Sequence, residues 1–213
     1  MDSSLTFNTL LALFGVMIVG ASVPGVSVLT VSARSAAFGF GHGIFVTLGI
    51  VTGDILFILV AIYGLSLLVG FMGAHFDLVK YFGGAWLIWL GIALWRSKSE
   101  TTGPKSDNKS SLLSSYLAGL LITLGDQKAI LFYLGLFPAL FDLPAFTLID
   151  TGIIITIAAT ALLFSKLVYA WLAARTNAVF KGDGPGKALN IAAGSVMLGV
   201  GIFLIMKTVI GHT

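Results

Sequence analysis

The chain has 213 residues, of which 57% are hydrophobic and 10% charged, and its mean hydropathy is +1.03. A soluble domain carries about 25% charged residues, so this composition excludes a water-soluble globular protein and predicts a polytopic membrane protein. The net charge is only +3, and no run of basic and aromatic residues indicates a nucleic-acid surface. Because cysteine is absent, disulfides, thiolate metal sites and a thiol-based membrane electron carrier are excluded.

Six segments are long and apolar enough to cross a bilayer, since a spanning helix needs about 20 mostly apolar residues. In chain order they cover roughly 5–31, 41–72, 76–95, 112–141, 144–174 and 187–210. The first lacks a preceding positively charged region, so we expect a retained helix and not a cleaved signal. The sequence therefore predicts an all-α membrane protein with a single transmembrane transporter domain over residues 1–213.

A polar linker divides these segments into two groups of three. It covers residues 97–111 (SKSETTGPKSDNKSS), between a first unit at about 5–96 and a second at about 112–210. Residues 83–94 (GGAWLIWLGIAL) resemble residues 193–204 (AGSVMLGVGIFL), with Gly84 over Gly194 and Gly91 over Gly201. Two three-helix units in series must insert in opposite orientations, which predicts the inverted repeats of many secondary transporters.

Basic residues predict the orientation of the helices, because cytoplasmic loops are enriched in Lys and Arg. Two lie in loops on one side, Lys80 and Lys207, and eight lie in loops on the other. The eight are Arg34, Arg96, Lys98, Lys105, Lys109, Arg175, Lys181 and Lys187. We therefore expect the second set in the cytoplasm and both termini outside it.

Each unit carries a helix-breaking sequence in its first predicted helix. In the first unit it is SVPGV (22–26), where Pro24 removes an amide donor and Gly25 frees the backbone. In the second it is LGDQK (124–128), with three polar residues in an apolar run, Asp126, Gln127 and Lys128. On a regular helix residues two apart point about 200° away from each other, so this acid and amine cannot pair. Either the backbone unwinds here or both groups reach separate interior partners, and both alternatives predict an interior site.

Two more charges fall inside predicted helices. Asp54 lies near the middle of the second, where a short acidic side chain cannot reach the headgroups, so we expect a proton-carrying or cation-binding carboxylate. A structural ion pair or a neutral carboxyl is the alternative. Lys166 lies in the fifth, where its stem could snorkel to the membrane surface. Because Lys166 falls near the repeat equivalent of Asp54, a charge pair that bridges the two units and acts as a gate is the other hypothesis.

The chain resembles the LysE/RhtB family of amino-acid exporters along nearly its whole length. The similarity lies in residues 21–43 (ASVPGVSVLTVSARSAAFGFGHG), 49–54 (GIVTGD), 81–97 (YFGGAWLIWLGIALWRS) and 119–138 (GLLITLGDQKAILFYLGLFP). Two departures stand out: Val26 replaces the family's second proline, and Asp126-Gln127 replaces Asn-Pro before the retained Lys128. The resemblance implies export of small metabolites, chiefly amino acids, driven by the proton gradient, by a homo-oligomer in the plasma (inner) membrane of a bacterium.

These observations predict a secondary exporter of an amino acid or derivative that works by proton antiport and alternating access. Its partners would be the substrate, protons and the lipid bilayer. We expect Asp54 to couple protons, Lys128 to bind the substrate carboxylate and Asp126 its ammonium, with Gln127, Pro24 and Gly25 completing the substrate site.

Other functions are either open or not indicated. An exporter of inorganic cations and a structural membrane subunit remain alternatives, although the sequence shows no metal-binding constellation. No P-loop, dinucleotide fingerprint or nucleophile elbow indicates an enzyme or a cofactor.

Overall fold

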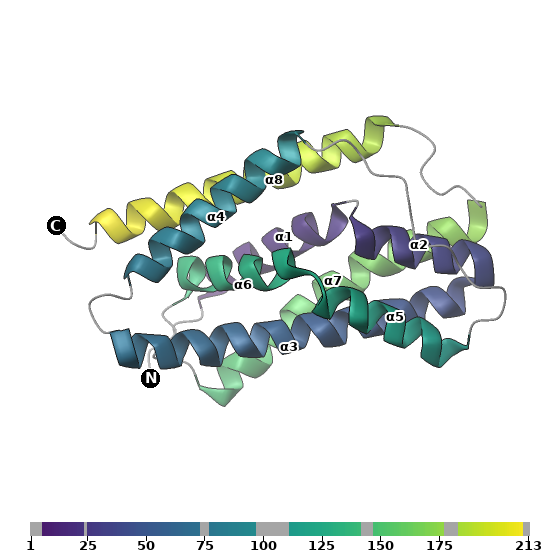
Figure 1. Ribbon diagram of the computed structural model, residues 1–213, viewed down its shortest axis with the longest axis horizontal. Coiled ribbons are helices and arrows are strands. Elements are labelled where there is room, and N and C mark those ends of the chain that lie inside the picture. The colour runs from purple at the N-terminus through teal and green to yellow at the C-terminus, as the bar shows by residue number, and fades with distance from the viewer. Residues whose placement is uncertain are drawn as a thin grey trace.

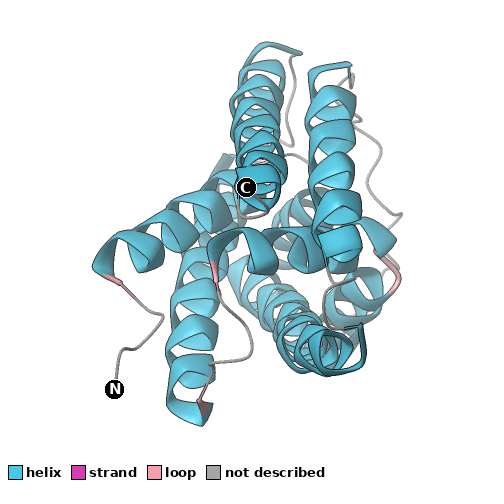
Figure 2. Ribbon diagram, turned by 90° about the vertical axis from the view of Figure 1, so that its left-hand side faces the viewer, coloured by secondary structure: helices cyan, strands magenta, loops and turns pink. Residues whose placement is uncertain are grey.

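The structure is a computed structural model that describes residues 6–23, 25–72, 77–96, 111–141, 147–176 and 183–210. Every regular element in these ranges is a helix (Figure 2). The helices are α1 (Phe7–Ser22), α2 (Val26–Phe38), α3 (Phe40–Met72), α4 (Asp77–Arg96), α5 (Leu112–Leu124), α6 (Gln127–Leu140), α7 (Leu148–Thr176) and α8 (Asp183–Ile210), shown in Figure 1. Each half of the chain therefore has the same order: a helix pair (α1 and α2, or α5 and α6), a long helix (α3 or α7) and one further helix (α4 or α8).

Both predicted helix breaks are confirmed. The axes of α1 and α2 differ by 63°, and those of α5 and α6 differ by 60°. The first break lies between Ser22 and Val26, and Pro24 itself lies outside the described residues. At the second break α5 ends at Leu124 and α6 begins at Gln127, so the chain bends here without a proline.

Two helices are by themselves long and apolar enough to cross a membrane, with 28 qualifying residues each: Phe40–Leu67 of α3 and Leu148–Arg175 of α7. If each bent pair counts as one span, the described residues hold four. α4 does not meet this test, and in α8 the apolar stretch Gly194–Ile210 is shorter than the 18 residues required. The predicted class, a helical membrane protein, is borne out, and the number of six spans stays a prediction.

The bent pair of each half packs on the long helix of the other half. α5 and α6 contact α3, whereas α1 and α2 contact α7, and α3 and α7 also contact each other. α4 and α8 run side by side in opposite directions and join the rest through α6 and α1 (Figure 1). α1 begins and α8 ends toward the same end of the molecule, at the left in Figure 1.

Glycines allow α4 and α8 to approach closely, as small residues commonly do between membrane helices. A Cβ atom at Gly91 would lie 2.6 Å from the Gly194 carbonyl oxygen, and one at Gly201 would lie 2.7 Å from the Gly84 carbonyl oxygen. These are the four glycines that the sequence comparison aligns. In that alignment Gly84 corresponds to Gly194, and Gly201 corresponds to Gly91. The contact between Gly84 and Gly201 is therefore the repeat equivalent of the contact between Gly194 and Gly91, so the packing of the two helices is reciprocal.

The contact between α3 and α5 is equally close. A Cβ atom at Gly49 would overlap the Tyr116 carbonyl oxygen, and one at Gly119 would overlap the Val46 carbonyl oxygen. This contact connects the two halves of the chain, so its geometry sets where the second bent pair lies against α3.

We expect Gly49→Ala to lower the free energy of unfolding by about 1–3 kcal/mol, because the added methyl forces α3 and α5 apart. Gly64→Ala on the same helix is the control, since nothing lies within 4 Å of a Cβ atom there. Thermal unfolding of the two purified variants in detergent measures the difference. Equal melting temperatures for the two variants would contradict this account of the α3–α5 contact.

Candidate functional site

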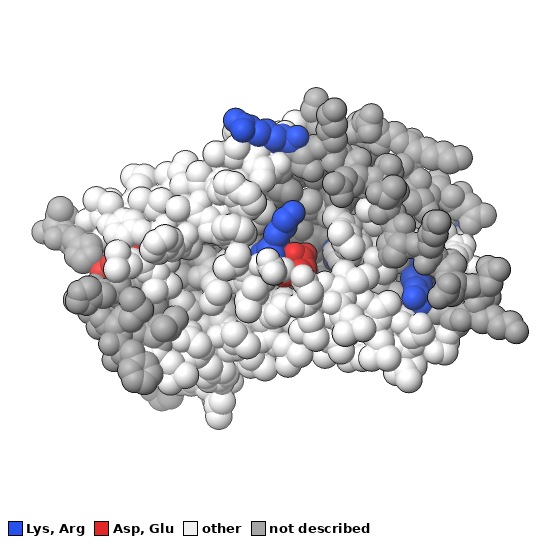
Figure 3. All heavy atoms as spheres, viewed as in Figure 1, with Lys and Arg blue, Asp and Glu red and all other residues white. Residues whose placement is uncertain are grey.

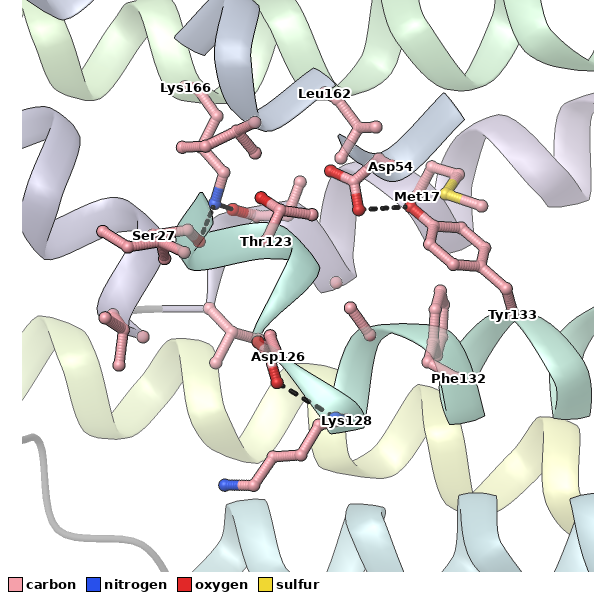
Figure 4. Close-up of a pocket in the computed structure, with 18 of the residues that line it drawn as sticks. Met17, Ser27, Asp54, Thr123, Asp126, Lys128, Phe132, Tyr133, Leu162 and Lys166 are labelled. Atoms are coloured by element: carbon pink, nitrogen blue, oxygen red, sulfur yellow. Dashed lines mark hydrogen bonds between the residues drawn. The ribbon is translucent and has the colours of Figure 1, made fainter. Parts of the chain in front are cut away.

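A cavity of about 590 Å³ lies where the two helix breaks face each other. All eight helices contribute to its wall, including the residues next to each break. Its size is typical of sites for small molecules, which range over roughly 300–1,000 Å³. It brings together two of the buried charges that the sequence singles out, Asp54 and Lys166. Figure 4 shows both pointing into the same space, with Thr123 between them.

Asp54 is held in place by a tyrosine from the opposite half of the chain. Its side chain lies on α3 and is only 7% exposed. The Tyr133 hydroxyl, on α6, donates a hydrogen bond to Asp54 Oδ1 at 3.0 Å. Among the described residues the second oxygen, Oδ2, has no hydrogen-bond partner. Asp54 therefore presents one fixed and one available carboxylate oxygen to the cavity.

Lys166 turns inward and does not snorkel. Its residue is 4% exposed, and its Nζ donates to the Ala21 carbonyl oxygen at 2.9 Å and to Ser27 Oγ at 3.0 Å. Ala21 lies in the last turn of α1, where carbonyl groups lack partners within the helix and a positive charge is stabilising. Lys166 thus joins the end of α1 to the start of α2, and within the described part of the chain no salt bridge links it to Asp54.

Two neighbours of Lys166 on α7 hold the same helix end. The Tyr169 hydroxyl donates to the Ser22 carbonyl oxygen at 2.7 Å. The hydroxyls of Ser22 and Ser165 lie 3.1 Å apart, within hydrogen-bond distance. Within about one turn, α7 therefore supplies three polar side chains to the broken end of α1, and two of them, Lys166 and Tyr169, satisfy backbone carbonyl groups there, as a membrane interior requires.

The second break is closed by its own residue. Asp126 Oδ1 accepts a hydrogen bond from the Lys128 backbone N–H at 3.0 Å, which makes Asp126 the N-cap of α6. Gln127 stands at the first position of α6, so the cap formed by Asp126 starts the helix without a proline. Asp126, Gln127 and Lys128 are all exposed, and of the three only Asp126 and Lys128 line the cavity.

The Lys128 side chain points away from Asp54 and Lys166 (Figure 4). Its ammonium group has no hydrogen-bond or ion-pair partner among the residues that the structure describes. In Figure 3 a basic and an acidic side chain lie together near the middle of an otherwise sparsely charged face, at the place where α5 meets α6 in Figure 1. Lys128 is exposed and lines the cavity, so it belongs to the cavity mouth.

At the first break the start of α2 is left open. Its N-cap is Gly25, which lines the cavity and provides no side-chain cap. The first hydrogen bond of the helix is the one from the Leu29 N–H to the Gly25 carbonyl oxygen, at 3.0 Å. The amides of the first turn are therefore available to a ligand.

Three polar residues of the cavity wall were not predicted from the sequence: Ser27, Thr123 and Tyr133. Tyr133 follows Asp126 by seven residues, about two helical turns, so both lie on the same face of α6. Ser27 lies in the first turn after the predicted break. These residues could have been found by searching for polar side chains within one or two helical turns of a predicted break. The described residues contain no group of three His, Asp or Glu that could hold a metal ion.

A helical membrane protein with buried opposite charges and two helix breaks around one cavity is of the transporter class. A family model described as LysE type translocator matches residues 18–208, so the chain belongs to this family, whose members are transporters and not enzymes.

Relatives agree with this membership. An uncharacterized membrane protein of Synechocystis is 43% identical over 95% of this chain and 98% of its own length. A homoserine/homoserine lactone efflux protein of Salmonella typhimurium is 29% identical, over 85% of this chain and 88% of its own. A leucine efflux protein of Enterobacter is 30% identical, over 69% of each chain. No solved structure matches the chain.

We expect Tyr133→Phe to lower the free energy of unfolding by about 1.5–3 kcal/mol, because Asp54 loses its hydrogen-bond donor in a buried place. Tyr63→Phe, on the same helix as Asp54 and 44% exposed, is the matched control. Unfolding in detergent micelles provides the measurement. A Tyr133→Phe protein as stable as the Tyr63→Phe protein would show that this hydrogen bond contributes nothing.

Proposed function

We propose that the protein is a secondary exporter that moves an amino acid or amino-acid derivative out of a bacterial cell in exchange for protons. The single observation that carries this proposal is the cavity at the two helix breaks, with Asp54 and Lys166 buried in its wall. A zwitterion offers one group for each of these charges. The relatives named as efflux proteins for homoserine, homoserine lactone and leucine support a substrate of this class.

Asp54 is the proposed coupling carboxylate. Its free oxygen can hold either a proton or the ammonium group of a substrate, but not both at once. Binding of one therefore releases the other, which is the requirement for exchange. The sequence pattern favours Asp126 for the ammonium, but Asp126 is exposed and already caps α6. The buried position of Asp54 supports it as the partner of the ammonium, because opposite charges attract more strongly away from water.

Alternating access would come from two inverted three-helix repeats, at about 5–96 and 112–210, that rock against each other. The repeated order of helices, the crossed packing of the bent pairs and the reciprocal glycine contacts of α4 and α8 support this proposal. An apolar cluster beside the cavity contains the rings of Phe132, Tyr133, Phe137 and Phe141. In the proposed cycle this cluster closes one side of the cavity and separates when the other side closes. Assembly as a homo-oligomer is proposed on the family resemblance.

The coupling proposal predicts that Asp54→Asn abolishes transport driven by a pH gradient, because an amide cannot exchange a proton. Purified protein would be reconstituted into vesicles loaded with a panel of radiolabelled amino acids, and efflux measured with and without the gradient. Asp126→Asn, which keeps an N-cap side chain, is the control and should still respond. Gradient-driven efflux by Asp54→Asn at the wild-type rate would refute the coupling role.

The proposed topology, with both termini outside the cytoplasm, can be tested directly because the chain has no cysteine of its own. We expect His212→Cys to react with a membrane-impermeant maleimide added to intact spheroplasts. Ser106→Cys, in the linker, should react only after the membrane is opened. The reverse labelling pattern would show that the orientation is inverted.

A further inference from the structure

We infer that Lys166, the hydroxyl of Ser27 and the open start of α2 together form the subsite for the carboxylate of the substrate, and that Lys128 lies outside it. This inference rests on the proposed function and assigns a binding group that the sequence pattern places elsewhere. It implies a substrate with a free carboxylate next to its ammonium group, that is, an α-amino acid.

The ammonium group of Lys166 retains a donor for a ligand. It has three N–H groups, and two of them bind the Ala21 carbonyl oxygen and Ser27 Oγ at 2.9 and 3.0 Å. The third has no acceptor among the described residues, and Lys166 is part of the cavity wall. A carboxylate placed here would accept from this donor and from the Ser27 hydroxyl or nearby amides.

The two helix starts that face the cavity differ in a way that selects one of them for an anion. The start of a helix attracts negative charge, because its first amides are unpaired and its dipole is positive there. At α6 this position is already occupied by the carboxylate of Asp126. At α2 the N-cap is Gly25, which supplies no side chain, so the amides remain open. The start of α2 is also the place that Lys166 reaches through Ser27.

Asp54 gives independent support for a charged ligand in this place. It is 7% exposed, faces the same space as Lys166 and has a carboxylate oxygen without a partner among the described residues (Figure 4). Two buried opposite charges in one cavity without a salt bridge between them are costly unless a ligand pairs with each. A zwitterion lying between them satisfies both. The rest of the wall includes Met17, Leu90, Phe132 and Met197, which suits an apolar side chain.

Lys128 is a weaker candidate for the same role. It is exposed and its side chain points away from Asp54, so water would screen its attraction for a carboxylate. Exposed ion pairs contribute about 0–1 kcal/mol, whereas hydrogen bonds to charged groups in a buried place contribute about 1.5–3 kcal/mol.

The experiment compares ligands that differ only in the carboxylate. Binding of leucine, methionine and homoserine, and of the three amines that remain when their carboxylate is removed, would be measured by calorimetry on full-length protein in detergent. We expect wild type to bind the best amino acid about 10- to 100-fold more tightly than its amine. Lys166→Met should remove this preference by weakening the binding of the amino acid. Lys128→Met, the matched control, should keep it.

A second variant covers the case in which Lys166→Met does not fold. Ser27→Ala leaves the bond from Lys166 to the Ala21 carbonyl oxygen in place, so the end of α1 stays capped. It should weaken amino-acid binding by about 2- to 10-fold and leave amine binding unchanged. An unaltered preference in Ser27→Ala, or a preference that survives Lys166→Met and is lost in Lys128→Met, would overturn the subsite alone. Failure of wild type to bind any of the six compounds would instead contradict the proposed function.

Discussion

The structure depends on one constraint: a helix that breaks inside a membrane exposes backbone groups that must be satisfied by the protein or face a cavity that it lines. At the end of α1 this is done from α7, where Lys166 and Tyr169 donate to the carbonyl groups of Ala21 and Ser22. At the start of α6 it is done locally by the carboxylate of Asp126. The start of α2, at Gly25, receives no side-chain cap. Of the two helix starts that line the cavity in the described part of the chain, only that of α2 therefore lacks a side-chain cap, and this is where a ligand can replace it.

The same constraint links the two halves of the chain. Because α7 caps the end of α1, and Tyr133 of α6 holds Asp54 of α3, the second half of the chain completes the polar contacts of the first in both places. Close backbone packing supports this arrangement, since glycine at positions 49 and 119 lets α3 and α5 approach within contact of each other's carbonyl groups. A movement of one half against the other would change both sets of contacts together. The proposed exchange of substrate for protons requires a physical coupling of this kind.

Much of the fold was accessible from local sequence. The helices, the break at residues 124–128, the break beside Gly25 and the interior position of Asp54 all follow from apolar length and from polar residues within apolar runs. Two assignments were less accessible. From the sequence we expected Lys128 to bind the substrate carboxylate, because it lies within the helix break. For Lys166 the sequence left two alternatives open: a side chain that snorkels to the membrane surface and a charge pair that acts as a gate. Gln127 falls outside the cavity wall, because it lies on the outer face of the first turn of α6.

The sequence by itself determined the membrane class, the helical character, the places where helices break and the family, because these follow from hydropathy and from short motifs. Only the tertiary structure decided which charges meet. Asp54 and Tyr133 are 79 residues apart, and Lys166 and Ala21 are 145 apart, so no local pattern relates them. Their proximity results from helix packing, which depends on the shapes of many side chains at once. The direction of a long side chain such as Lys166 is decided in the same way, by whether an unsatisfied carbonyl group lies within its reach.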